Sequence, residues 1–194
     1  MTENPVKVAV IVGSTRAGRF GPTVANWFVE HAEKRADIAV DLIDLAQDQL
    51  PAHMSNEPEP AGARALRSVG ARLTTADGFV VVTPEYNHSY PAPLKSAIDW
   101  HFTQWQAKPI GFVSYGGISG GLRAVEHLRH VFAELHAVTV RDTVSFHSAA
   151  QLFDPTGKLT DPSAPEAAAD QLLDQLVWWG SALRSARTER PYVA

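Results

Sequence analysis

Residues 13–21, GSTRAGRFG, combine residue types that bind phosphate groups. They follow the apolar run VAVIV and precede a segment with helical character, PTVANWFVEHAEKR. Ser14 and Thr15 offer hydroxyl groups for hydrogen bonds to a phosphate. Arg16 and Arg19 add positive charge, and backbone amides at the start of a helix attract anions. The alternative interpretation is a capping turn, in which the two hydroxyl groups only accept hydrogen bonds from the first amides of the helix.

The loop matches neither of the two common glycine motifs for nucleotides. It lacks the lysine of GxxxxGK[ST], which holds the phosphates of a nucleoside triphosphate. It also lacks the glycine spacing of the dinucleotide fingerprint. A monophosphate therefore fits this loop better than either of those ligands.

Two further polar segments follow apolar runs. The first, TPEYNHSYPAP at residues 83–93, contains three prolines that restrict its backbone. A flat heterocycle could stack near Tyr86 there and form hydrogen bonds with the main chain, although a rigid turn that opens the next helix is the alternative. The second, SYGGISGG at residues 114–121, contains four glycines, which let the backbone approach a ligand closely.

Apolar runs bounded by polar turns predict β-strands that are covered on both faces. The predicted strands are Val6–Ser14, Ile38–Ala46, Gly78–Tyr86, Pro109–Gly117 and Ala137–Phe146. Helical patterns alternate with them, which predicts an α/β fold: a flavodoxin-like, doubly wound, five-stranded parallel sheet of order 2-1-3-4-5 with helices on both faces. In such a sheet the three polar loops meet at the carboxyl edge, where ligands of these folds bind.

The helical segments carry apolar residues at spacings of three and four. In residues 120–136 the expected inward positions are Leu122, Val125, Leu128, Phe132 and Leu135. A last helix is predicted over residues 164–187, and a proline-rich surface loop over residues 47–62.

Four of the five tryptophans raise questions about burial. Trp100 and Trp105, with Phe102 between them, belong either to the core or to a subunit interface. Trp178 and Trp179 are adjacent in one predicted helix, so they cannot both face the core.

Composition narrows the class of protein. The chain of 194 residues is expected to form one domain, residues 1–194. A formal net charge of -4 provides no basic surface for nucleic acid. The chain has no cysteine, which excludes disulfides and thiolate nucleophiles and fits a reducing compartment. The chain lacks a signal-peptide pattern and a long apolar run, so we expect a cytoplasmic protein with no membrane partner, and its charge predicts no nucleic-acid partner. His127 and His130 lie three residues apart without an H-E-x-x-H pattern, so we expect no metal site.

The three motifs together resemble the NADPH-dependent FMN reductase family, which includes flavin, quinone, azo-dye and chromate reductases. The matching segments are GSTRAGR, PEYNHSYPAPLKSAIDW and SYGGISGGLRAVEHLR, in that order, within residues 6–146. The resemblance implies an enzyme that passes a hydride from NADPH or NADH through FMN to a small acceptor: free flavin, a quinone, an azo compound or a metal oxyanion. The flavin carries the chemistry, so no catalytic side chain is implied. A flavodoxin-type electron carrier and a flavin-binding regulatory module are the alternative functions.

The resemblance also implies roles for individual residues. Those expected at the FMN phosphate are Ser14, Arg16, Arg19, Phe20 and Gly21. Those expected to border the isoalloxazine ring, chiefly through the main chain, are Pro84, Glu85, Tyr86 and Asn87 on one side and Ser114, Tyr115, Gly116 and Gly117 on the other. Family members commonly form dimers or tetramers, so a homodimer or homotetramer is implied.

Overall fold

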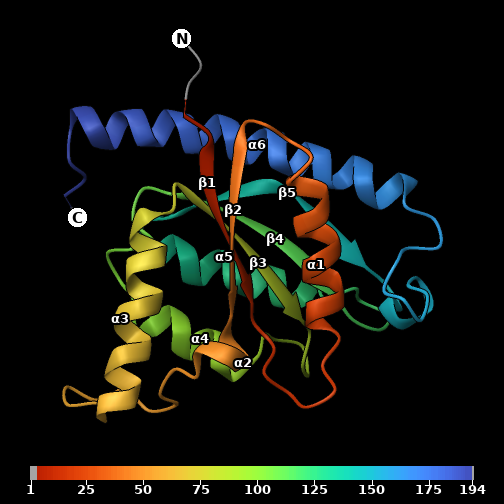
Figure 1. Cartoon of the computed structure of the whole chain (residues 1–194), viewed down its shortest axis with the longest axis horizontal. Coiled ribbons are helices and arrows are strands. Elements are labelled where there is room, and N and C mark those ends of the chain that lie inside the picture. The colour runs from red at the N-terminus through yellow and green to blue at the C-terminus, as the bar shows by residue number, and fades with distance from the viewer. Residues whose placement is uncertain (1–3, 194) are drawn as a thin grey trace.

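A computed structural model of the chain describes residues 4–193. Within these residues, five strands form one sheet of order β2-β1-β3-β4-β5, and every neighbouring pair is parallel (Figure 1). The strands are β1 (Val6–Val12), β2 (Ile38–Asp44), β3 (Gly78–Pro84), β4 (Pro109–Tyr115) and β5 (Val138–Phe146). The predicted fold and strand order are therefore confirmed. Each strand lies within its predicted run but is one or two residues shorter.

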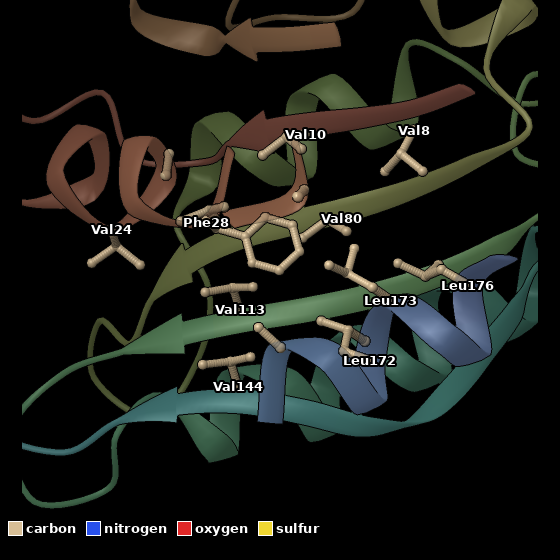
Figure 2. Close-up of a cluster of buried hydrophobic side chains, with 14 of the residues drawn as sticks. Val8, Val10, Val24, Phe28, Val80, Val113, Val144, Leu172, Leu173 and Leu176 are labelled. Carbon is tan, nitrogen blue, oxygen red and sulfur yellow. The ribbon is translucent and has the colours of Figure 1, made fainter. Parts of the chain in front are cut away.

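Alternation along the strands sends side chains to two separate cores. Val8 and Val10 of β1 contact the layer formed by α1 (Gly21–Ala32) and α6 (Ser163–Glu189). Figure 2 shows this core, with Phe28 of α1 and Leu172 of α6 pointing toward valines of the sheet.

The second core lies on the opposite face of the sheet. The neighbouring residues of β1, Ala9 and Ile11, point to this face. It is covered by α3 (Pro60–Thr75), α4 (Ala92–Asp99) and α5 (Leu122–Glu134). Because both faces are covered, every residue of β3 and β4 is buried, as expected for continuous apolar runs at the centre of a parallel sheet.

The structure corrects two predictions about the helices. The predicted loop over residues 47–62 contains helical structure at both ends, in α2 (Leu45–Asp48) and in the first turn of α3. The Asp44 side chain accepts a hydrogen bond from the Ala46 amide, which caps α2 and starts it early. Leu122 is 41% exposed rather than inward, because it begins α5 at the open edge of the sheet.

The aromatic residues separate into core and surface. Trp105 is buried against Phe79, with ring centroids 4.8 Å apart, whereas Phe102 is 51% exposed. Trp100 is half-buried and donates a hydrogen bond to the Pro51 carbonyl. Trp178 is exposed and Trp179 half-buried, so the prediction that they cannot both face the core is confirmed. A short 3-10 helix, Ala149–Gln151, follows β5.

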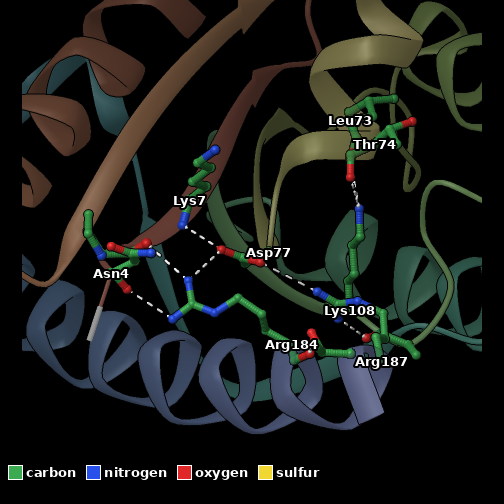
Figure 3. Close-up of polar contacts among 11 residues, drawn as sticks. Asn4, Lys7, Leu73, Thr74, Asp77, Lys108, Arg184 and Arg187 are labelled. Carbon is green, nitrogen blue, oxygen red and sulfur yellow. Dashed lines mark hydrogen bonds and ion pairs between the residues drawn. The ribbon is translucent and has the colours of Figure 1, made fainter. Parts of the chain in front are cut away.

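A buried charged cluster fixes the amino edge of the sheet (Figure 3). Asp77 accepts hydrogen bonds from the Lys7 amide at 3.1 Å and from Arg184 of α6 at 3.0 Å, and Arg187 lies 3.5 Å away. The Lys108 amine donates to carbonyls in the last turn of α3. Burial lowers the pKa of Lys108 to about 8. These contacts fasten α3 and α6 to the edge opposite the polar loops.

Candidate cofactor site

The loop after β1 ends at an uncapped helix. Gly13 donates its amide to the Val82 carbonyl of β3 at 2.9 Å, which fixes where the loop leaves the sheet. Phe20 occupies the N-cap position of α1 and cannot accept a hydrogen bond through its side chain. Among residues 4–193, no side chain accepts from the first amides of α1, and its first turn holds no acidic residue. The capping-turn interpretation of Ser14 and Thr15 is therefore wrong, and the start of α1 is open to an anion.

Ser14 and Tyr86 bring the first and second loops together. Ser14 is fully buried, and its Oγ lies 2.7 Å from the Tyr86 Oη in a hydrogen bond. Arg16 is exposed, with its guanidinium carbon 5.8 Å from the centroid of the Tyr86 ring. The sequence predicted that these loops meet at the carboxyl edge, and the structure places them in direct contact.

Arg19 is held by a carboxylate that sequence reasoning missed. Its guanidinium forms two hydrogen bonds with Asp44, at 2.5 and 2.7 Å, and a third with the Ser14 carbonyl at 2.8 Å. Asp44 is the last residue of β2, the strand beside β1, so it lies at the same edge of the sheet. Arg19 thus braces the loop against β2, and its predicted contact with a phosphate stays a prediction. The sequence did contain a signal for this contact, namely an acidic residue at the end of the neighbouring predicted strand.

The second loop turns through two residues in the left-handed region. Tyr86 and Ser89 exchange backbone hydrogen bonds at 2.8 and 3.1 Å. Between them, Asn87 has φ 49° and His88 has φ 73°, the geometry of a tight hairpin turn. Both side chains are exposed, whereas Pro84 is buried at the end of β3. The rigid turn that the sequence suggested is therefore present, and it presents its main chain at the edge of the sheet.

Glu85 connects the second and third loops. Its carboxylate accepts hydrogen bonds from the Ser119 hydroxyl at 2.7 Å, from Arg123 Nε at 2.6 Å and from the Arg123 amide at 3.2 Å. Burial opposes ionisation, but the donors at Ser119 and Arg123 outweigh it and lower the pKa of Glu85. The side chain of Glu85 therefore points toward α5, and only its main chain is left to border a ligand.

Hydrogen bonds to carbonyl groups hold the third loop in place. The Ser114 and Ser145 hydroxyls both donate to the Gly120 carbonyl, at 2.8 and 2.9 Å, and His147 Nδ1 donates to the Ile118 carbonyl at 2.8 Å. Gly120 has φ 59°, and a Cβ there would lie 2.7 Å from the His147 ring. This position therefore requires glycine.

The main chain of the third loop is partly used by its neighbours. The Gly116 amide donates a hydrogen bond to the Phe146 carbonyl, and the Gly116 carbonyl accepts one from the Ala149 amide. Gly117 is exposed. Ser114 and Tyr115 are adjacent in β4, so their side chains point to opposite faces of the sheet. Tyr115 points toward α1, with its ring 6.1 Å from that of Phe20, centroid to centroid.

Comparison with known proteins decides the family. Residues 6–151 match the profile of the NADPH-dependent FMN reductase family. The chain belongs to this family. The family confirms the predicted class, an oxidoreductase that uses FMN and NAD(P)H. None of the helices in residues 4–193 is both long and apolar enough to cross a lipid bilayer.

Individual relatives agree with this assignment. An NAD(P)H-dependent FMN reductase of Schizosaccharomyces pombe is 38% identical over 132 residues, covering 64% of each chain, so the match spans slightly less than two thirds of that relative. A probable NADPH:quinone oxidoreductase of Oryza sativa subsp. japonica is 30% identical over 175 residues, covering 87% of this chain and 86% of the relative. FerB, a flavoenzyme NAD(P)H:(acceptor) oxidoreductase from Paracoccus denitrificans, superposes with a TM-score of 0.70 at 24% identity, covering 91% of this chain and 98% of FerB. This last similarity concerns the fold.

Proposed function

We propose that this protein is an NAD(P)H-dependent reductase that delivers two electrons to a small acceptor through bound FMN. The observation that carries the proposal is the open start of α1, which follows a loop whose Ser14 and Arg16 both contact Tyr86 at the carboxyl edge of the sheet. Bound FMN would accept a hydride from the nicotinamide and return two electrons to the acceptor. We further propose that residues 1–194 form a single FMN-binding domain.

The residues present fit a flavin mononucleotide. The amides of Phe20 and Gly21 have no hydrogen-bond acceptor among the described residues, and a phosphate supplies acceptors for such groups. Arg16 is exposed in the same loop and adds a positive charge. We assign the phosphate to this end of the site, with Arg19 bracing the loop.

The second and third loops fit the ring end of the same ligand. Glu85 ties these two loops together, so their main chains form one rim at the ends of β3 and β4. We assign the isoalloxazine ring to the main chain of two segments, Pro84–Asn87 and Ser114–Gly117. This arrangement binds and orients the flavin without a protein acid or nucleophile.

Quinones and free flavins are the acceptors that we propose first. The names of relatives support them, including the rice protein above and a 2-hydroxy-1,4-benzoquinone reductase of Burkholderia that is 34% identical over 139 residues. Azo compounds and metal oxyanions remain further candidates. Phe102, 51% exposed after α4, supports the proposal of a homodimer or homotetramer, because exposed aromatic residues are typical of subunit interfaces.

Steady-state turnover of the purified protein tests the proposal. NADPH and NADH are each supplied with quinone, FMN, an azo dye or chromate, with and without added FMN. We expect many turnovers per protein molecule with FMN present. In parallel, Arg16→Ala is expected to weaken FMN binding roughly tenfold to a hundredfold, as for a lost hydrogen bond to a charged group. Arg141→Ala is the control, because that side chain is 90% exposed on β5. A wild-type protein that leaves the FMN absorbance and fluorescence unchanged would refute the function.

A further inference from the structure

The hydroxyl of Tyr115 is buried without a hydrogen-bond partner. Tyr115 is the last residue of β4 and is only 6% exposed. Its Oη has no partner among residues 4–193. A buried donor without an acceptor is costly, so such groups are few in native proteins and each calls for an explanation.

The unpaired hydroxyl lies against the first residue of α1. A Cβ added at Gly21 would be 2.9 Å from Tyr115 Oη and 3.8 Å from Ser14 Cβ. The Tyr115 hydroxyl and Ser14 are therefore close to the same helix start, where the amides of Phe20 and Gly21 lack acceptors. The absence of a side chain at Gly21 is what makes room for this hydroxyl.

The surroundings of Tyr115 keep its hydroxyl protonated. Burial raises the pKa of the Tyr115 phenol above its ordinary value, and the nearby Tyr86 acts in the same direction. The neighbouring Ser14 hydroxyl acts against this shift, as do the cations Arg19 and Arg16, but they do not reverse it. The hydroxyl is therefore a donor at neutral pH, in a place that already attracts negative charge.

We propose that the Tyr115 hydroxyl donates a hydrogen bond to the phosphate of bound FMN. Tyr115 then belongs to the phosphate end of the site through its side chain, although its main chain lies at the ring end. The inference rests on the proposed function and adds to it a binding residue from β4, the strand two places from β1 in the sheet. In the flavin-free protein the donor stays unpaired, and the phosphate supplies the missing acceptor.

The variant Tyr115→Phe tests the inference with two ligands that differ only in the phosphate. FMN and riboflavin are titrated into flavin-free protein, and dissociation constants are measured from flavin fluorescence. We expect the variant to bind FMN about tenfold more weakly, as for a lost hydrogen bond to a charged acceptor. Riboflavin is expected to bind wild type and variant equally. Tyr192→Phe is the matched control, because its phenol bonds His136 at the surface instead.

Each outcome has a separate meaning. Equal weakening of FMN and riboflavin would place the hydroxyl at the ring and overturn the inference. Unchanged FMN affinity would overturn it as well, while leaving the proposed function intact. If wild-type protein binds neither flavin, the proposed function fails first. As a second measurement, inorganic phosphate should raise the melting temperature of flavin-free wild type more than that of Tyr115→Phe, and an equal rise would contradict the inference.

Discussion

Gly21 packs directly against the buried Tyr115 hydroxyl, and the change Gly21→Ala tests this contact in the flavin-free protein. The added Cβ would lie 2.9 Å from Tyr115 Oη and 3.0 Å from Val12 Cγ1. Both distances are shorter than the optimum of about 3.5–4.0 Å for nonbonded atoms. We expect overpacking to lower the free energy of unfolding by about 1–3 kcal/mol. The preference of helices for alanine over glycine offsets up to about 1 kcal/mol of that loss.

Urea denaturation followed by tryptophan fluorescence measures the effect. Gly70→Ala is the matched control, because Gly70 also lies in a helix, α3, but a Cβ there would be 3.4 Å from the His101 ring, close to ordinary contact. This control is expected to be unchanged or stabilised by up to about 1 kcal/mol. Comparable slopes of unfolding free energy against urea are required before the midpoints are compared.

Combining Gly21→Ala with Tyr115→Phe measures how much of the Gly21→Ala effect comes from the Tyr115 hydroxyl. By itself, Tyr115→Phe should raise the unfolding free energy by about 1 kcal/mol, because it removes a buried donor that has no partner. In that background Gly21→Ala should cost less, since one of its two close contacts is gone, with a coupling of about 0.5 kcal/mol or more. If Gly21→Ala matches the Gly70→Ala control, or costs the same in both backgrounds, the packing described for Tyr115 is refuted.

Three other variants probe the rest of the site and the opposite edge of the sheet. Glu85→Gln removes the charge that pairs with Arg123, so FMN should bind roughly fivefold more weakly by fluorescence titration; unchanged affinity would argue against the link between the loops. Asp44→Asn weakens the ion pair with Arg19 and should cost about 1–3 kcal/mol of unfolding free energy in urea; no loss would contradict the bracing role. The pKa of Lys108 is about 8 in the folded protein against an ordinary 10.5, so between these pH values the unfolded chain binds more protons and stability rises with pH. Relative to Lys108→Met, the unfolding free energy of wild type should rise by up to about 3 kcal/mol over this pH range in urea melts. The same pH dependence in both proteins would refute the burial of the Lys108 amine.

The strands and their order were predictable because each depends on a local property of the chain. Runs such as residues 78–82 are apolar throughout, as expected for a strand covered on both faces, and β3 is indeed buried at every position. Right-handed crossovers between parallel strands then leave few possible topologies. The polar loops follow strands in the sequence, so their meeting at one edge of the sheet followed from the fold class. The resemblance of the loop motifs to a known family further predicted FMN as the cofactor and NAD(P)H as its reductant.

The direction and partner of each polar side chain depended on the tertiary structure. Arg19 looks like a phosphate ligand in the sequence, but it pairs with Asp44, 25 residues away, because β2 and β1 end side by side. Glu85 likewise binds Arg123, 38 residues along the chain, because the loops after β3 and β4 are neighbours.

In this protein the sequence alone determined which segments are buried, how they are ordered in the sheet and which loops form its carboxyl edge. Only the tertiary structure decided that Ser114 holds its own loop while Tyr115 reaches α1 with a free hydroxyl. The physical reason is that burial is encoded by the periodicity of single segments. A hydrogen bond, in contrast, requires two groups within about 3 Å of each other, and this distance is set by how separate elements pack.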